Sequence, residues 1–306
     1  MNILCINARK GVGDQVLFLS FIHAISKKFK TPVALLAKDN SKAKDLFFDD
    51  NHVDEVISLK KEMDGINGIF KLTCELKKRN FDKIFIFNSS LRYNLIARFA
   101  GIKSIHQYPL FRSKDNIVLS AKIFTESIIN EVVSTEPNLI IKKKDNNLDK
   151  NFKHICLGIS SSGPTKKWHI ENYIKLAEKI NKKIKCKFYL AGGKNDINLI
   201  NEFKNSDVGK NCISFEKLSI RETLPIIKDM NLMISNDTSW SHIAVALKIR
   251  TLTLFMDSPV MAYGRYSSRM VTVEPVGEKD TTTHDTLGKD KISFDEVYNK
   301  SIQMLS

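Results

Sequence analysis

A run of four polar residues, Asn236-Asp237-Thr238-Ser239, separates an apolar segment from a segment with helical spacing. The apolar segment, 232–234, predicts a buried strand, and residues His242 to Leu247 recur at the spacing of a helix face. Each of the four polar residues favours a helix N-cap. Free N–H groups and the helix dipole would bind an anion such as phosphate there. On spacing alone, simple capping by Asp237 or Thr238 remains the stronger interpretation.

A second hydroxyl-rich stretch, 160–168, follows the apolar run 155–159 and precedes a helical pattern. Ser160 and Ser161 supply hydroxyl groups, and Lys166 supplies a positive charge. This combination can hold a phosphate group, with the lysine acting as a point charge. Without further information, a flexible surface loop explains the same residues equally well.

The first turn of the chain, Arg9-Lys10-Gly11-Val12-Gly13-Asp14, joins an apolar run at 3–6 to a helical pattern at 15–29. Its glycines resemble those of a nucleotide-binding loop, but it is neither GxGxxG nor a Walker A sequence. Asp14 sits where the helix is expected to start. N-capping is therefore the simplest role for its carboxylate.

Strand and helix patterns alternate along the whole chain, which predicts parallel sheets covered by helices on both faces. The predicted strands are 3–6, 33–37, 53–59, 83–87, 102–106, 155–159, 186–191, 212–215, 232–234 and 251–255. The predicted helices are 15–29, 69–78, 91–100, 117–133, 171–180, 195–203, 220–228, 242–247 and 294–304. The tail 259–291 is rich in Gly, Thr, Tyr and Asp and is expected to form loops.

A charged stretch with few apolar residues, 142–153, predicts a linker between two domains. We therefore expect an N-terminal domain at 1–145 and a C-terminal domain at 152–306. A closing helix at 293–305 is expected to complete the second domain. Packing of this helix back onto the first domain is the alternative. Ligands of such sheets bind at the carboxyl ends of the strands, so a cleft between the domains is the expected site.

The composition limits the classes of binding partner and the cellular compartment that we expect. The formal net charge of +14, from 48 Lys+Arg and 34 Asp+Glu, indicates an anionic partner such as a nucleotide, a phosphorylated glycan or an acidic lipid surface. Without an arginine-rich tract or basic-aromatic interleaving, nucleic acid is the weaker choice. Five cysteines without CxxC spacing, no secretory segment and no run of ~20 apolar residues predict a cytoplasmic protein. No histidine spacing suggests a metal site.

Taken together, the motifs resemble glycosyltransferase family nine, the lipopolysaccharide heptosyltransferases. The matching stretches are Arg9 to Asp14, Asp54 to Ile57, Gly158 to Trp168 and Ser235 to Leu247, in the family's order. The chain departs from the family pattern at Ser239, where glycine is usual, and at His169, where proline is usual. The resemblance spans nearly the whole sequence.

The resemblance implies a GT-B fold, in which two Rossmann-like, doubly wound domains face each other across a cleft. The N-terminal domain would bind the acceptor and the C-terminal domain the nucleotide-sugar donor. It implies inverting, metal-independent transfer of a heptose or related sugar from ADP-heptose, without a cofactor. The expected acceptor is an acidic glycan or lipopolysaccharide core, with peripheral contact at the inner face of the cytoplasmic membrane and no nucleic acid.

The same resemblance implies roles for individual residues. Asp14 matches the catalytic base, and Lys166 matches a contact to the departing pyrophosphate. The implied donor-binding residues are Ser160, Ser161, Asp196, Asp237, Thr238, Ser239 and His242. Among these, Asp196 is the candidate for the nucleotide ribose, although it is displaced by one or two places from the family's acidic residue. His242 fits a structural residue of the helix better than a base.

Two other functions share this architecture. A nucleotide-sugar epimerase would release free products without any acceptor. A non-catalytic module would leave its nucleotide sugar intact.

Overall fold

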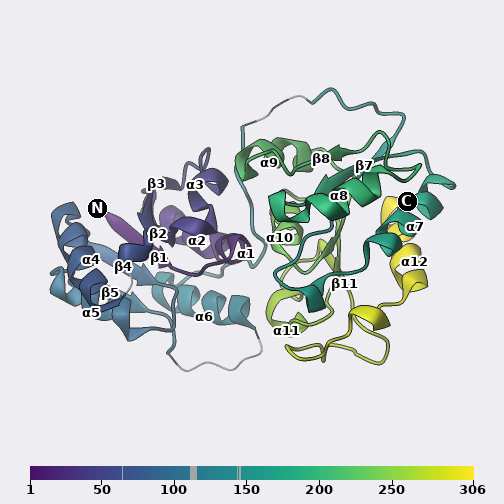
Figure 1. Cartoon of the computed structure of the whole chain (residues 1–306). Helices are drawn as coiled ribbons and strands as arrows, with labels where there is room; N and C mark the ends of the chain where they lie inside the picture. The colour runs from purple at the N-terminus through teal and green to yellow at the C-terminus, as the bar shows by residue number, and fades with distance from the viewer. Residues whose placement is uncertain (64, 111–115, 143, 145) are drawn as a thin grey trace. The chain divides into compact units, whose positions relative to one another are not determined.

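The computed structural model describes residues 1–63, 65–110, 116–142, 144 and 146–306. They form two compact units, Met1–Ile140 and Ile141–Ser306, each built around one parallel sheet (Figure 1). The predicted α/β architecture is therefore present in both halves of the chain. No described helix is long and apolar enough to cross a bilayer.

The first unit contains a five-stranded sheet in the order β3-β2-β1-β4-β5. The strands are β1 (Ile3–Asn7), β2 (Val33–Lys38), β3 (Val53–Leu59), β4 (Lys83–Ile86) and β5 (Ser104–Gln107). The helices are α1 (Val12–Leu17), α2 (Leu19–Phe29), α3 (Ala43–Leu46), α4 (Gly65–Arg79), α5 (Leu91–Phe99) and α6 (Ile117–Ile129).

Alternate side chains of the first sheet enter two different cores, as the pleat of a strand requires. On one face, strand residues such as Ile6 and Ile84 pack with Leu72 of α4 and Ile96 of α5. Elsewhere in the unit, the ring of Phe87 packs edge-on against Phe18 and Phe124, with centroids 5.6 and 5.5 Å apart. Burial of both strand faces explains why the strands were readable as continuous apolar runs.

The second unit contains a six-stranded sheet in the order β11-β10-β9-β6-β7-β8. The strands are β6 (Lys153–Gly158), β7 (Cys186–Ala191), β8 (Ile213–Ser214), β9 (Leu232–Asn236), β10 (Thr251–Leu254) and β11 (Met270–Val273). The helices are α7 (Ile170–Asn181), α8 (Ile197–Lys204), α9 (Ile220–Lys228), α10 (Ser239–Ala246), α11 (Val260–Tyr263) and α12 (Phe294–Leu305).

Both sheets reverse their strand order at one point, which singles out the loops where a ligand is expected. Counted along the chain, the second sheet has the Rossmann order 3-2-1-4-5-6, and its order reverses between β6 and β9. In the first sheet, the order reverses between β1 and β4. Ligands of open parallel sheets bind outside the carboxyl ends of the strands at such points.

The first predicted helix is wrong in its start and its continuity. The predicted segment 15–29 is two helices that meet at Phe18, and α1 begins at Val12. The early start is stabilised by Asp14, whose Oδ2 accepts a hydrogen bond from the Gly11 N–H at 3.2 Å. Asp14 therefore belongs to the first turn of α1, where an acidic side chain favours the helix dipole.

The C-terminal half also differs from the prediction. The tail 259–291, expected to be loops, contains α11 and the edge strand β11, which pairs in parallel with β10. The segment is short and carries polar Thr272, so its apolar pattern is weak; pairing with β10 stabilises it as a strand. The closing helix α12 does not need the first unit for burial, because Val297, Met304 and Leu305 join the core of the second unit.

Three of the five cysteines, Cys5, Cys156 and Cys186, are buried, whereas Cys74 is exposed on α4. Burial raises the pKa of the Cys186 thiol to about 11, so this group behaves as a small apolar side chain at neutral pH.

Candidate functional site

One buried amide, that of Asn236, connects the two loops at the reversal point of the second sheet. Its Nδ2 donates to the carbonyls of Ile159 and Ser160, both at 3.1 Å. Its Oδ1 accepts from the Trp168 N–H at 3.1 Å and from the Tyr173 hydroxyl at 3.0 Å. Asn236 is fully buried, and both hydrogens and both lone pairs of its amide are used. The end of β9 thus fixes the start and the end of the loop after β6.

The backbones of β6 and β9 approach closely beside this amide. A Cβ atom added at Gly158 would lie 2.2 Å from Ser235 Oγ, so only glycine fits. Trp240 of α10 donates from Nε1 to Ser160 Oγ at 3.1 Å. The loop after β6 is therefore tied both to β9 and to the helix that follows it.

The three predicted phosphate contacts of this loop differ in the hydrogen bonds and ion pairs that they already form within the protein. Ser160 accepts from Trp240, which leaves its own hydroxyl hydrogen available for a ligand. Ser161 instead donates to the Gly163 carbonyl at 2.5 Å, so its hydroxyl must rotate before it can donate elsewhere. Within the described residues, half-buried Lys166 forms no ion pair. Its ammonium group is available to a ligand anion.

The N-terminus of α10 lies on the same side of the sheet, because it directly follows β9. Thr238 is the N-cap residue in extended conformation, and Ser239 is the first residue of the helix. The Thr238 side chain does not cap the helix. Both residues are half-buried rather than enclosed, so the first N–H groups and the helix dipole can meet an anion.

Asp237 is held by two side chains from elsewhere in the second unit. Ser258 Oγ donates to Asp237 Oδ2, and His242 Nε2 lies 3.8 Å from Asp237 Oδ1. His242 Nδ1 is 2.7 Å from the Tyr266 hydroxyl. A neutral His242 that accepts from Tyr266 carries its proton on Nε2, facing the carboxylate. Buried His242 thus lies beside Asp237, and its predicted donor-binding role stays a prediction.

The predicted ribose contact, Asp196, is already engaged on both carboxylate oxygens. Oδ1 accepts from Lys167 Nζ at 3.1 Å, and Oδ2 accepts from the Gly193 N–H at 3.0 Å. The residue is largely buried, with a relative exposure of 8%. Asp196 therefore orders the start of α8 and fixes Lys167, and a ribose would have to displace one of these partners.

Sequence reasoning missed two residues that follow β10, Asp257 and Ser258. Burial by itself would raise the pKa of Asp257, but hydrogen bonds from the Leu287 N–H and from Thr165, with the charge of Lys166, lower it. The Leu287 N–H lies 3.0 Å from its Oδ1. Asp257 is therefore an anion that faces the Thr165–Lys166 part of the loop. The available signal was an Asp-Ser pair just beyond the predicted strand 251–255 and just before the predicted tail 259–291.

In the first unit, Asp14 lies at the carboxyl edge of the sheet beside β1. Besides the Gly11 contact, its carbonyl accepts from Asn7 Nδ2 at 3.1 Å. Gln15 Nε2 donates to the carbonyls of Asn7 at 3.1 Å and Arg9 at 3.4 Å. Two amides thus fix the backbone around a half-buried carboxylate. This geometry suits a helix cap and a proton acceptor equally.

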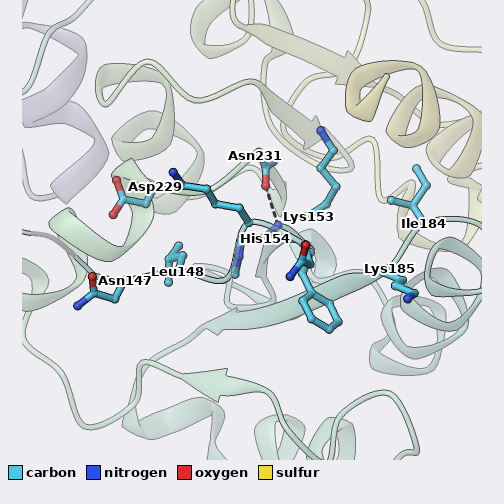
Figure 2. Close-up of a pocket in the computed structure, with 11 residues that line it drawn as sticks. Asn147, Leu148, Lys153, His154, Ile184, Lys185, Asp229 and Asn231 are labelled. Carbon is cyan, nitrogen blue, oxygen red and sulfur yellow. Dashed lines mark hydrogen bonds between the residues drawn. The ribbon is translucent and has the colours of Figure 1, made fainter.

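A polar hollow of ≈ 1000 Å³ lies at the other, amino-terminal edge of the second sheet (Figure 2). The His154 N–H donates to Asn231 Oδ1 at 2.7 Å, and its ring nitrogens lie 3.0 Å from the Tyr189 hydroxyl and the Asp149 carbonyl. These groups satisfy one another, so we assign them to the fold. Among the described residues, no three His, Cys, Asp or Glu side chains are grouped to hold a metal ion.

The sequence was then compared with known proteins. Residues 69–289, more than two thirds of the chain, match the profile of glycosyltransferase family 9 (heptosyltransferase). The chain belongs to this family. No curated protein matches its sequence. As a member of family 9, the protein is a glycosyltransferase.

Solved structures agree with this assignment at the level of the fold. ADP-heptose LPS heptosyltransferase II of E. coli superposes with a TM-score of 0.77 at 18% identity, covering 100% of this chain and 98% of that one. A family 9 glycosyltransferase of Veillonella parvula gives 0.78 at 16%, covering 99% and 97%. E. coli heptosyltransferase WaaC with ADP gives 0.75 at 12%, covering 99% and 100%. The predicted GT-B fold class is confirmed.

The two departures from the family pattern have visible consequences in this glycosyltransferase. Ser239 adds a hydroxyl group to the first turn of α10. His169 is the N-cap of α7, and its Nε2 lies 2.6 Å from Asp290 Oδ1. The hydrogen bond from His169 lowers the pKa of the Asp290 carboxyl. His169 thus links the loop after β6 to the segment that precedes α12.

The role of the Asn236 amide can be tested with Asn236→Asp. The new carboxylate would face two carbonyls in a buried site, so its pKa in the folded state is expected to rise above the ordinary ~3.9. Stability is then lost progressively as pH rises above that ordinary value. We expect a loss of about 3 kcal/mol in unfolding free energy at pH 8 and a smaller loss at pH 5.

Denaturant unfolding at the two pH values measures this difference. The control Asn201→Asp, on the exposed face of α8, should change stability by less than about 0.5 kcal/mol. Equal small losses from both variants at both pH values would show that Asn236 does not hold the loops together.

Proposed function

We propose that this glycosyltransferase transfers a heptose or related sugar from an ADP-sugar to a lipopolysaccharide core or another surface glycan, with inversion and without a metal. The proposed setting is the cytoplasm, with the acceptor at the inner face of the cytoplasmic membrane. The carrying observation is the pair of loops after β6 and β9, joined by Asn236. They combine hydroxyl groups, a lysine that forms no ion pair among the described residues and a helix N-terminus at one edge of a Rossmann sheet. E. coli WaaC, which shares the fold, was solved with ADP and with ADP-2-deoxy-2-fluoro heptose.

Departure of the diphosphate is the first chemical demand on the enzyme. The leaving group gains negative charge as the bond from the sugar to the phosphate breaks. Lys166 can neutralise part of that charge, while N–H groups of α10 and the Ser160 hydroxyl donate to phosphate oxygens. The Ser160 hydroxyl and the α10 N–H groups are held in place before the reaction, which is the condition under which such donors favour the transition state over the bound substrate.

Activation of the acceptor hydroxyl is the second demand, and we assign it to Asp14. Its carboxylate would accept the proton as the hydroxyl oxygen attacks the anomeric carbon. A single displacement of this kind inverts the configuration at that carbon. Asp237, oriented by His242 and Ser258, is the candidate contact to hydroxyl groups of the donor sugar.

Membership of a glycosyltransferase family favours transfer over the epimerase and over the non-catalytic module that the sequence left open. Incubation of the donor with and without acceptor separates the three functions. Transfer requires the acceptor, an epimerase consumes the donor without it, and a binding module leaves the donor intact.

Donor preference is the direct test of the proposal. We expect ADP and ADP-heptose to raise the melting temperature more than UDP, GDP, CMP or their sugars, because ligand binding stabilises the folded state. At 100 times the dissociation constant, the gain is about 2.7 kcal/mol. Transfer should continue in EDTA. A clear preference for UDP-sugars, or loss of transfer in EDTA, would contradict the assignment.

The adjacent lysines of the loop should respond differently to alanine. Lys166 is free to bind the diphosphate, so Lys166→Ala should weaken ADP binding about tenfold or more with an unchanged melting temperature. Lys167 pairs with Asp196, so Lys167→Ala should lower the melting temperature with a smaller change in ADP affinity. Calorimetric titration and thermal unfolding measure both effects. Equal losses of affinity would mean that only the overall positive charge matters.

Asp14→Asn distinguishes the base from the cap. Asparagine keeps a side-chain oxygen that can accept from the Gly11 N–H, so stability and ADP affinity should stay close to the parent. It cannot accept the proton, so turnover should fall by roughly two orders of magnitude, the lower end of a general-base contribution. The control Asp54→Asn removes an exposed carboxylate of β3 and should leave turnover unchanged. Near-parental activity of Asp14→Asn would identify Asp14 as a cap.

A further inference from the structure

The outer faces of α4 and α5 carry large apolar side chains that the fold does not bury. Ile66 and Phe70 lie one turn apart on α4 and are 86% and 76% exposed. Leu91, Leu95 and Phe99 follow one another at four-residue spacing on α5, and each is at least 46% exposed. Four-residue spacing aligns side chains along one side of a helix. Each helix therefore presents an apolar stripe to the outside.

These stripes are separate from the hydrophobic core. The inner sides of the same helices supply Leu72 and Leu76 of α4 and Ile96 and Ala97 of α5 to the core of the first unit. The helices pack side by side (Figure 1). Arg92 at the start of α5 donates to the carbonyls of Met63 at 2.6 Å and Gly65 at 2.8 Å, which ties it to the start of α4. The two apolar stripes thus occupy neighbouring helices in a fixed arrangement.

The charged residues of α4 and α5 themselves are almost all positive. The helices contain the cations Lys71, Lys77, Lys78, Arg79, Arg92 and Arg98, and one acid, Glu75. Arg79 pairs with Glu75 at 2.9 Å and also with Glu55 of β3, so its charge is neutralised within the unit. Apolar side chains flanked by lysine and arginine are typical of surfaces that lie in the interface of an anionic bilayer. A second copy of the same surface would bring like charges together, which opposes self-association.

The start of this surface lies next to the loop that carries Asp14. The N–H of Ala8, the first residue after β1, donates at 2.8 Å to Oδ1 of Asn88, the second residue after β4. Ser90 then caps α5 by accepting from the Arg92 N–H at 3.3 Å. Both helices therefore begin at the carboxyl edge of the sheet, where Asp14 is found.

We propose that the outer faces of α4 and α5 dock onto an anionic lipid bilayer, with Ile66, Phe70, Leu91, Leu95 and Phe99 in the interface. The docked surface would present a lipid-anchored acceptor to the Asp14 loop. Delivery of the acceptor rests on the proposed function, whereas bilayer binding does not.

Sedimentation with lipid vesicles tests the docking. The protein should bind vesicles of phosphatidylcholine with a third phosphatidylglycerol, bind weakly to phosphatidylcholine alone, and dissociate at high salt, because salt screens surface charge. Phe70→Glu with Leu95→Glu should lower partitioning at least tenfold. The control Val276→Glu changes an equally exposed side chain of the second unit, 71% against 76%, and should have no effect. Equal losses from both variants would overturn the proposal.

The cations have a matched test of their own. Lys77→Glu with Lys78→Glu should lower partitioning into the anionic vesicles at least tenfold, since each charge near an anionic surface contributes about fivefold. Lys182→Glu with Lys183→Glu reverses the same number of charges on an exposed turn of the second unit and should change partitioning much less. If both pairs act equally, the net charge and not this surface is responsible.

Two further measurements separate the remaining outcomes. If Phe70→Glu with Leu95→Glu turns a dimer into a monomer in sedimentation velocity and leaves vesicle binding intact, the surface is a protein interface and the proposal is wrong. Transfer to a delipidated acceptor should be unchanged in this variant, while transfer to the same acceptor in vesicles falls about tenfold. Vesicle binding without any transfer would overturn the proposed function and leave the docking surface standing.

Discussion

The site of the second unit depends on one buried amide. Asn236 ends β9, yet all of its side-chain hydrogen bonds go to the loop after β6 and to the start of α7. A buried polar group without partners destabilises a protein by about 1–3 kcal/mol, so the amide and the loop can only be buried together. The positions of Ser160, Lys166 and the α10 N-terminus follow from this requirement. The close contact of Gly158 with Ser235 adds a steric requirement, because a side chain at position 158 would separate β6 from β9.

The carboxyl edges of the two sheets supply different groups to the proposed reaction. The edge of the second sheet offers hydroxyl groups, helix N–H groups and a lysine, beside the carboxylates of Asp237 and Asp257. At the edge of the first, besides the Asp14 carboxylate, the amide oxygens of Asn7 and Gln15 and the donor Arg9 Nε are buried without partners among the described residues. Transfer of a sugar from a diphosphate to a hydroxyl needs both donors and a proton acceptor, because the phosphate accepts hydrogen bonds and the hydroxyl gives up its proton.

Apolar periodicity was sufficient to predict the buried strands, and β3, β7 and α9 match their predicted ranges residue by residue. It failed where tertiary contacts decide the structure. Polar Asn236 continues β9 because its amide has partners across the sheet, and β11 is a strand because β10 pairs with it. Of the candidate site residues, those in one loop could be grouped from sequence. The Lys167–Asp196 pair and the Tyr266–His242 contact join residues 29 and 24 positions apart and required the fold.

The net charge of +14 indicated an anionic partner, but it did not show whether the protein has one such partner or several. Among the residues of the donor loop, only Lys166 is available, since Lys167 is neutralised by Asp196. One lysine cannot account for an excess of fourteen positive charges. Six cations against one acid on α4 and α5 account for five of them. Because these charges lie on the same two helices as the exposed apolar side chains and far along the chain from the donor loops, they fit the proposed anionic surface and not the nucleotide.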